Sequence, residues 1–192
     1  FEFIIVDDCS HKIPLTKIDN VRCFRITDDI FFNLPGSRNL GVQMAKSDYV
    51  MICDMDTIIT PECAYKLLDL IPKTNVIYKF NRFVRNNKSH PKHYKIHPGI
   101  FLVNRQSYLN VFGCDEDFAG SYGNYTRSLE YKLVSQKAFK VFECSDIFVE
   151  YVPEGDCDIN KDKNTNRKLF NKKVKNDSWS DDMLRFQWNE LK

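Results

Sequence analysis

The sequence predicts a single α/β domain, with a sheet flanked by helices. Three observations predict it. Apolar, strand-like runs alternate with helix-like stretches through the first half of the chain, the arrangement that builds a sheet by right-handed crossovers. The chain has 192 residues, a length that fits one domain, and 43% of them are hydrophobic, enough for a buried core. No apolar run approaches the ~20 residues of a membrane-spanning helix, so we expect no transmembrane segment.

The first quarter of the chain supplies three strands and one helix. Residues 1–6 are an apolar run that ends on two acids, and residues 21–27 alternate weakly, so both are expected to be strands. Ser37 follows a Pro-Gly turn and is expected to be the N-cap of a helix that reaches about Lys46. Residues 49–54 form an apolar run that stops abruptly on charge, which predicts a buried parallel strand.

Helix and strand signals continue beyond this run. Thr60 is expected to cap a helix that has Pro61 at its first position and that ends at Pro72. Residues 76–84 and residues 99–103 are apolar enough to predict two more strands.

The last third of the chain is more helical. Residues 122–134 support a helix, and residues 139–149 support one or two strands. Residues 167–192 are amphipathic and predict one or two further helices, with Trp179 and Trp188 in the core.

Two pairs of carboxylates follow predicted strands, at the ends where α/β proteins bind ligands. Asp7 and Asp8 follow the first strand, and Asp54 and Asp56 follow the third, so we expect them to share one edge of the sheet. Residues i and i+2 of an extended chain point to the same face. Asp54 and Asp56 can therefore converge on one hard cation, and through it on a diphosphate. His97 is a candidate third ligand, and a histidine in a surface turn is the alternative.

Six short motifs occur in order within residues 1–133. They are the strand that ends in Asp-Asp-Cys-Ser at residues 1–10, the Arg-Asn-Leu-Gly segment at 36–41, the Ala-Lys-Ser-Asp-Tyr-Val run at 45–50, Asp54-Met55-Asp56, and two blocks at 97–103 and 112–123. Together they resemble the DDxS strand, R-N-x-G helix, D-x-D and G-x-D-E-x-F acceptor block of family-2-like glycosyltransferases. The resemblance implies the GT-A fold, a Rossmann-like mixed sheet flanked by helices.

The resemblance also implies a donor site. Asp8 would accept a hydrogen bond from the base or ribose of the nucleotide, and Arg38 would lie beside the nucleotide or diphosphate. Asp56 would bind Mn²⁺ or Mg²⁺ directly, and Asp54 would bind the ribose or a metal-bound water. The implied donor is a nucleotide-diphosphate sugar, by default a UDP-hexose. For Arg38, an ion pair with Asp48 or Asp54 is the alternative.

One position departs from the family's pattern. Family members place an Asp that acts as general base after the glycine-rich turn, where this chain has Thr126. A threonine hydroxyl cannot act as a base near neutral pH. Asp115 and Glu116 are among the nearest carboxylates, and one of them is expected to be the catalytic base or to hold the acceptor. Inverting and retaining chemistry both stay open.

The resemblance divides the single domain of residues 1–192 into three parts. Residues 1–103 would bind the nucleotide sugar, residues 104–153 would bind the acceptor, and residues 154–192 would be a C-terminal helical tail. The implied acceptor is a glycan or a glycan on a protein. The net charge of +2 is close to balance and gives no argument for a nucleic-acid partner.

Cysteine usage indicates a reducing compartment. The seven cysteines have no zinc-type spacing and several lie in apolar, strand-like runs, so we expect free thiols. We therefore expect a cytoplasmic protein, either free or attached to the periphery of a membrane. Phe1 stands where Met is usual, so the natural N-terminus is expected upstream.

Three other functions fit some of these residues. A haloacid-dehalogenase-type phosphatase carries D-x-D on a strand, and a phosphorelay receiver domain has a spacing close to that between Asp8 and Asp54. A catalytically inactive sugar-nucleotide-binding module would keep Asp56 and lack a base at Thr126.

Overall fold

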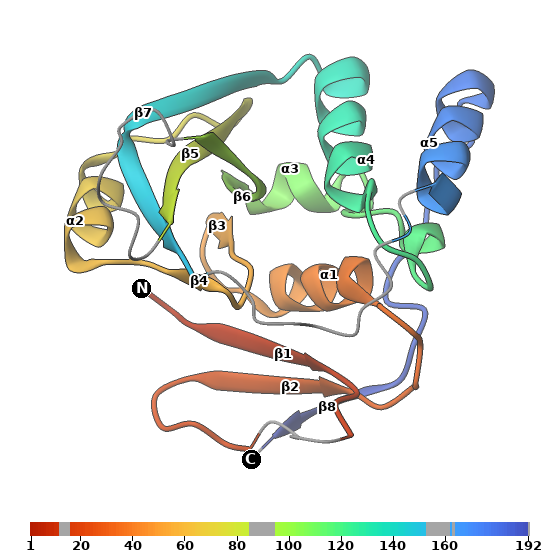
Figure 1. Ribbon diagram of the computed structural model, residues 1–192, viewed down its shortest axis with the longest axis horizontal. Helices are drawn as coiled ribbons and strands as arrows, with labels where there is room; N and C mark the ends of the chain where they lie inside the picture. Colours follow the sequence, from red (N-terminus) through yellow and green to blue (C-terminus); the bar gives the residue numbers. More distant parts are fainter. Residues whose placement is uncertain (12–15, 85–94, 153–161, 163, 192) are drawn as a thin grey trace.

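The computed structural model describes residues 1–11, 16–84, 95–152, 162 and 164–191. It contains two β-sheets with helices packed around them, and both ends of the chain lie at the smaller sheet (Figure 1). The α/β fold class predicted from the sequence is confirmed. Among the described residues, no helix combines the length and the apolar character needed to cross a bilayer.

The smaller sheet has three strands. β1 (Ile4–Asp8) and β2 (Arg22–Ile26) confirm the first two predicted strands, and they pair in parallel. β2 pairs on its other side with the antiparallel strand β8 (Trp188–Leu191), which comes from the far end of the chain.

β8 corrects the prediction of a helical tail. α5 (Asn164–Asn176) confirms the first part of the helix expected over residues 167–192, but the chain beyond it turns back and ends as a strand. β8 completes the hydrogen bonds of β2, and Trp188 places its ring edge-on to Phe24, with 5.9 Å between the centroids. The expectation that Trp188 lies in the core is wrong, because 37% of its surface is exposed, whereas Trp179 is half-buried. Residues 154–161 of the expected tail lie outside the described residues.

The larger sheet has five strands in the order β3-β6-β5-β7-β4. Their bounds are β3 Tyr49–Ile52, β4 Thr57–Ile58, β5 Val76–Val84, β6 Lys95–Asn104 and β7 Lys140–Tyr151. β5 and β7 are parallel, and the other neighbours are antiparallel. The expected strands at 49–54, 76–84, 99–103 and 139–149 are all present.

The expectation that residues 49–54 form a parallel strand is wrong. β3 pairs only with β6 among the described strands, and it does so antiparallel, with Val50 opposite Val103 and Ile52 opposite Phe101. β3 lies at the edge of the sheet, with Val50 and Ile52 in one core cluster and Met51 partly buried against the other. An antiparallel edge strand can therefore carry an apolar run of the kind that favours a parallel strand.

α1 (Leu34–Met44) connects the two sheets. Its N-cap is Asn33, whose side chain accepts from the Gly36 amide at 3.1 Å, so the expected cap at Ser37 is wrong by one turn. Ser37 instead lies inside the helix, because Pro35 is compatible with its first turn. Leu40 packs with the core of the small sheet, and Val42 packs with the core of the large sheet.

The other helices follow their local signals closely. α2 (Pro61–Asp69) is capped by Thr60, which accepts from the Cys63 amide at 3.2 Å as predicted. The helix expected at 122–134 is present as α4 with a π-helical turn after it. The remaining bounds are α3 Arg105–Leu109, the 3₁₀ turn η2 Glu116–Phe118, α4 Tyr125–Tyr131 and the π turn η3 Lys132–Gln136.

Candidate functional site

Asp54, Asp56 and His97 gather beside β3. Asp54 and Asp56 lie in the turn between β3 and β4, which the Thr57 amide closes by donating to the Asp54 carbonyl oxygen at 3.2 Å. His97 comes from β6, the strand that pairs with β3. One ligand atom of each of the three side chains lies within 4.8 Å of the others. The structure thus brings together the three residues proposed as metal ligands.

The two carboxylates fit a hard divalent cation. Mg²⁺ and similar ions bind oxygen ligands and are commonly held by one or two carboxylates plus substrate phosphates. Asp54 and Asp56 are half-buried, so solvent and a ligand can still reach them. The main chain of Asp56 is anchored by the Val152 amide, which donates to its carbonyl oxygen at 2.8 Å. Backbone hydrogen bonds therefore hold the turn that carries Asp54 and Asp56 in place.

His97 is buried, with 4% of its surface exposed. Its Nδ1 accepts a hydrogen bond from the Gly99 amide at 3.1 Å, so a neutral ring carries its proton on Nε2. Burial lowers the pKa of His97 to about 4; Asp54 opposes this shift, and Arg82 and Arg38 add to it. The ring is therefore neutral at pH 7 and offers a proton rather than a lone pair. Metal ligation by His97 would require the bond to Gly99 to break, and the ligand role stays a prediction.

Arg38 is buried beside this group, and both terminal nitrogens of its guanidinium donate hydrogen bonds. Nη2 donates to Asp54 Oδ1 at 2.5 Å and to the Gly99 carbonyl oxygen at 3.1 Å. Nη1 donates to the Thr126 hydroxyl at 2.6 Å, and the guanidinium carbon lies 5.1 Å from the centroid of the Tyr125 ring. The ion pair with Asp54, kept as the alternative from the sequence, is present. Contact of Arg38 with a donor diphosphate stays a prediction.

Gly99 makes the ion pair possible. A Cβ at this position would clash with the Asp54 carboxylate and would lie 3.1 Å from Arg38 Nη2. Any other residue would push the carboxylate and the guanidinium apart. The glycine is therefore needed for close approach between β6 and the turn after β3.

Thr126 lies beside this ion pair. It is in the first turn of α4, and its hydroxyl accepts the hydrogen bond from Arg38. The position where relatives would carry a general base is thus next to the Asp54 ion pair, and it holds a neutral group.

Asp8 is a second carboxylate with capacity left for a ligand. One of its oxygens accepts from the Asn33 amide at 2.7 Å. The other, Oδ1, is buried and has no hydrogen-bond partner among the described residues. Burial raises the pKa of Asp8 to about 6; the Asn33 amide opposes the shift, and Asp7 and Asp29 add to it. A buried acceptor without a donor fits the expected contact with an N–H of a nucleotide base.

Asp8→Asn should stabilise the free protein at pH 7 and leave its stability at pH 4 nearly unchanged. The pKa of Asp8 is raised from 3.8 to about 6 on folding, so the folded state binds more protons than the unfolded state between these values. Stability is therefore lost as pH rises through this window, by up to about 3 kcal/mol at pH 7 before solvent screening of the partly exposed carboxylate lowers this figure. Urea unfolding of both proteins at pH 4 and pH 7 measures the effect, and a variant less stable than wild type at pH 7 would contradict it.

The two acidic strand ends do not share a sheet, contrary to the expectation. β1 belongs to the small sheet and β3 to the large one. α1 bridges them instead: the amide of its N-cap Asn33 binds Asp8, and Arg38 on the same helix binds Asp54. Both candidate donor-binding acids are thus tied to one helix.

Asp115 has a structural role that the sequence did not reveal. It is fully buried, and its Oδ1 caps the 3₁₀ turn by accepting from the Asp117 amide at 3.0 Å. Oδ2 accepts from the Ser180 amide at 3.2 Å and pairs with Lys173 Nζ at 2.9 Å. The carboxylate therefore joins the acceptor-side block to the C-terminal segment.

Glu116 has the same kind of role. Oε1 accepts from Asn39 Nδ2 and from the Leu184 amide, both at 2.8 Å, and Oε2 accepts from the Arg185 amide at 3.0 Å. These donors come from α1 and from the C-terminal segment. The catalytic assignment of Asp115 and Glu116 stays a prediction, and the observed contacts are those of residues that hold chain segments together.

Asn39 links α1 to the segment that contains Cys114 and Glu116. It is fully buried and makes four hydrogen bonds: its amide donates to the Cys114 carbonyl oxygen and to Glu116, and its oxygen accepts from the Tyr108 hydroxyl and the Cys114 amide. The distances are between 2.7 and 2.8 Å. The sequence signal was its place in the R-N-x-G motif, which gave no indication of what it binds.

Comparison of the sequence with known proteins found two matches. Residues 1–141 match the family model described as glycosyl transferase family 2. A protein of Haemophilus influenzae described as an uncharacterized glycosyltransferase is 33% identical over 82 residues, which are 41% of this chain and 28% of that protein.

Two solved structures of Drosophila β1,4-galactosyltransferase 7 are similar to the chain. The catalytic domain in complex with xylobiose is 22% identical, with a TM-score of 0.45 over 65% of this chain and 50% of the enzyme chain. A mutant in complex with manganese, UDP-Gal and xylobiose is 18% identical, with a TM-score of 0.50 over 76% of this chain and 64% of the enzyme chain. At such identity the second likeness shows a shared fold. The chain spans less than two thirds of each of these relatives.

Proposed function

The chain belongs to glycosyl transferase family 2, and from this membership we propose that it transfers a hexose from a nucleotide-diphosphate sugar to a hydroxyl group of a glycan acceptor. UDP-hexose is the proposed donor, and the acceptor is a free glycan or a glycan on a protein. Family membership sets aside the phosphatase and the phosphorelay receiver as alternatives.

The observation that carries the proposal is the convergence of Asp54 and Asp56 at the end of β3, with Arg38 buried beside them. Asp56 and Asp54 are the residues that would hold Mn²⁺ or Mg²⁺. When bound, such an ion would offset the negative charge that develops on the leaving diphosphate. Arg38 keeps the Asp54 carboxylate in place, and His97 stays neutral beneath it.

Asp8 would recognise the nucleotide. Its buried Oδ1 lacks a donor among the described residues, and a base N–H would supply one. The acceptor would lie over the block of residues 115–123, which α1 and the C-terminal segment support through Asn39 and Glu116.

A second candidate function is a sugar-nucleotide-binding module without transferase activity. Thr126 favours it, because a hydroxyl that already accepts from Arg38 at 2.6 Å stands where relatives would carry the base. The two functions share donor binding and differ in whether the nucleotide is released from its sugar.

Asp56→Asn should abolish metal-dependent binding of UDP and leave the fold intact. The side chain is half-buried in a turn, and replacing a carboxylate by an amide removes the charge that an oxygen-preferring cation requires. Calorimetric titration of UDP with Mn²⁺ into both proteins measures the loss. Asp48→Asn is the matched control, because Asp48 is exposed just before β3.

Two outcomes decide between the candidate functions. Unchanged UDP affinity in Asp56→Asn would remove this residue from the donor site. Release of UDP from a UDP-hexose by the wild-type protein, lost in Asp56→Asn, supports the transferase, whereas UDP binding without release in the presence of acceptor glycans supports the binding module.

The cellular location stays a proposal. Six cysteines within the described part of the chain are free thiols, and Cys157 lies outside it. We propose a reducing, cytoplasmic setting with the option of peripheral membrane attachment, testable by fractionation of cells that express the tagged protein.

A further inference from the structure

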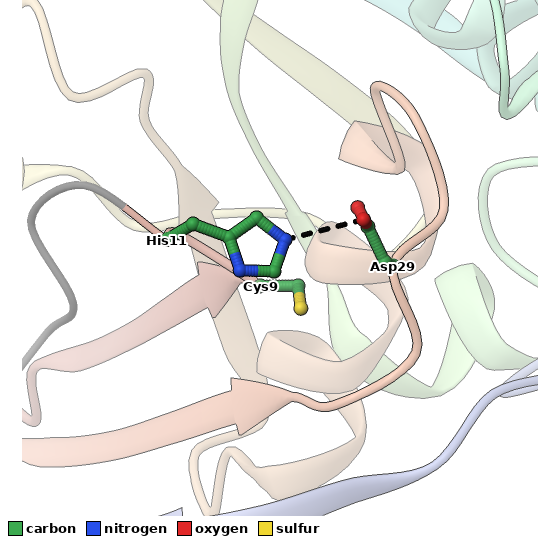
Figure 2. A group of neighbouring side chains, drawn as sticks. All are labelled: Cys9, His11 and Asp29. Atoms are coloured by element: carbon green, nitrogen blue, oxygen red, sulfur yellow. Dashed lines mark hydrogen bonds and ion pairs between the residues drawn. The ribbon is translucent and has the colours of Figure 1, made fainter.

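A second group of metal-ligating side chains lies at the end of the small sheet. Cys9 and His11 follow β1, and Asp29 follows β2 (Figure 2). Because β1 and β2 are parallel, with Asp8 opposite Ile26, the two loops leave the sheet at the same edge. One ligand atom of each side chain lies within 4.8 Å of the other two.

We propose that Cys9, His11 and Asp29 form a binding site for a thiophilic divalent cation of the Zn²⁺ class. Thiolate, imidazole and carboxylate are the ligands that zinc uses, whereas Mg²⁺ and Mn²⁺ favour oxygen. The chemistry of this group therefore differs from that of Asp54 and Asp56. Three protein ligands leave one of the four tetrahedral positions of zinc for water or a further ligand.

The ligands are already close to one another. His11 Nε2 and Asp29 Oδ2 are 3.2 Å apart. Figure 2 shows the Cys9 thiol beside these two side chains. Cys9 has a positive φ of 52°, an unusual conformation for a residue other than glycine. The Ser10 amide holds this conformation by donating to Asp7 at 3.1 Å.

The loop that carries Asp29 is also anchored. The neighbouring Asp28 accepts from the Gln187 amide through its side chain and from the Ile30 amide through its carbonyl oxygen, both at 2.9 Å. Binding at this point would therefore join two loops that each have a supported backbone, so little ordering is needed.

Charge and exposure favour an exchangeable cation. The carboxylates of Asp29, Asp8 and Asp7 place negative charge near the Cys9 thiol, and the guanidinium of Arg25 places positive charge near it. Arg25 is itself paired with Asp7 at 2.8 Å, so Asp8 and Asp29 leave negative charge around the thiol. The side chains of His11 and Asp29 are 71% and 74% exposed, so an ion can enter directly from solvent.

A catalytic thiol is a poorer interpretation of the same residues. Cys9 Sγ lies 3.6 Å from the Thr27 carbonyl oxygen, to which its S–H is directed. Within the described part of the chain, the thiol and the imidazole of His11 share no hydrogen bond, and activation of a cysteine nucleophile depends on such a base.

The test uses the whole chain, kept reduced with a non-thiol reductant, and Co²⁺ as a coloured substitute for Zn²⁺. Wild-type protein should bind one Co²⁺ with a thiolate-to-cobalt charge-transfer band, which Zn²⁺ displaces. Cys9→Ser should lose the band, and His11→Ala and Asp29→Asn should weaken binding at least about tenfold. Zn²⁺ should also raise the melting temperature of the wild type, because an ion that binds only the folded state stabilises it.

Two matched variants isolate the site. Cys53→Ser removes another exposed thiol, and Asp54→Asn with Asp56→Asn removes the other candidate metal group; both should keep the band. A wild-type protein without a charge-transfer band overturns the proposal. So does a band that survives in Cys9→Ser or that disappears in Cys53→Ser. Melting curves without metal confirm that each variant is folded.

Discussion

Glu116→Gln should lower the free energy of unfolding by about 3–5 kcal/mol. The carboxylate is buried and accepts hydrogen bonds from Asn39, from the Leu184 amide and from the Arg185 amide. A glutamine can offer only one oxygen, so its NH₂ group would face a donor. The variant would lose at least one charge-assisted hydrogen bond and leave a buried N–H unsatisfied, each costing about 1–3 kcal/mol.

Denaturant unfolding of wild type and variant measures this loss, with turnover followed at a temperature where both are folded. Glu143→Gln is the control, since Glu143 is exposed on β7 and its replacement should change stability by less than about 0.5 kcal/mol. A Glu116→Gln protein that unfolds like wild type and has lost turnover would contradict the structural role and support the catalytic one.

Asp54→Ala should destabilise the free protein by about 3 kcal/mol, whereas Asp48→Ala, at an exposed position, should change its stability by less than about 0.5 kcal/mol. Arg38 is only 4% exposed in its side chain, and Asp54 is its charge partner at 2.5 Å. Breaking a buried pair leaves an uncompensated charge, which typically costs about 3–5 kcal/mol. We expect the lower value, because Arg38 keeps its bonds to Thr126 and to the Gly99 carbonyl oxygen.

A double-mutant cycle separates the ion pair from other effects of the substitution. Adding Arg38→Met to Asp54→Ala removes the stranded charge, so the double variant should be more stable than Asp54→Ala alone. Thermal and urea unfolding of the four proteins give the coupling energy. Equal losses in Asp54→Ala and Asp48→Ala, with no recovery in the double variant, would show that the pair does not stabilise the fold.

For some residues of the candidate site, the sequence predicts their position correctly. For others, the contacts that define their role are not predictable from the sequence. Asp54 and Asp56 converge as predicted, but they do so in a turn, closed by the bond from the Thr57 amide to the Asp54 carbonyl oxygen, and not in an extended strand. The turn is still a local structure of neighbouring residues. The sequence left two possible roles for Arg38, a contact with the donor or an ion pair with a nearby acid. Its bonds to Asp54 and to Gly99 of β6 are visible only in the folded structure.

Asp115 and Glu116 show the limit of sequence reasoning. Their acidity and position in a glycosyltransferase-like block predicted catalysis, but their partners are Lys173, Ser180 and Leu184. Those partners lie between 58 and 68 residues away along the chain, beyond any local pattern, counting from 115 to 173 and from 116 to 184.

Sequence patterns were enough to predict the α/β class, the family, the cap of α2 at Thr60 and the acidic turn after β3. Each of these depends on periodicity, capping or motif spacing within a short stretch of chain. Long-range packing sets three other features: β3 pairs antiparallel with β6, β8 pairs with β2, and α1 with its N-cap binds both Asp8 and Asp54. The physical reason is that strand pairing and buried ion pairs join residues that are distant in sequence, and their free energy overrides local propensity.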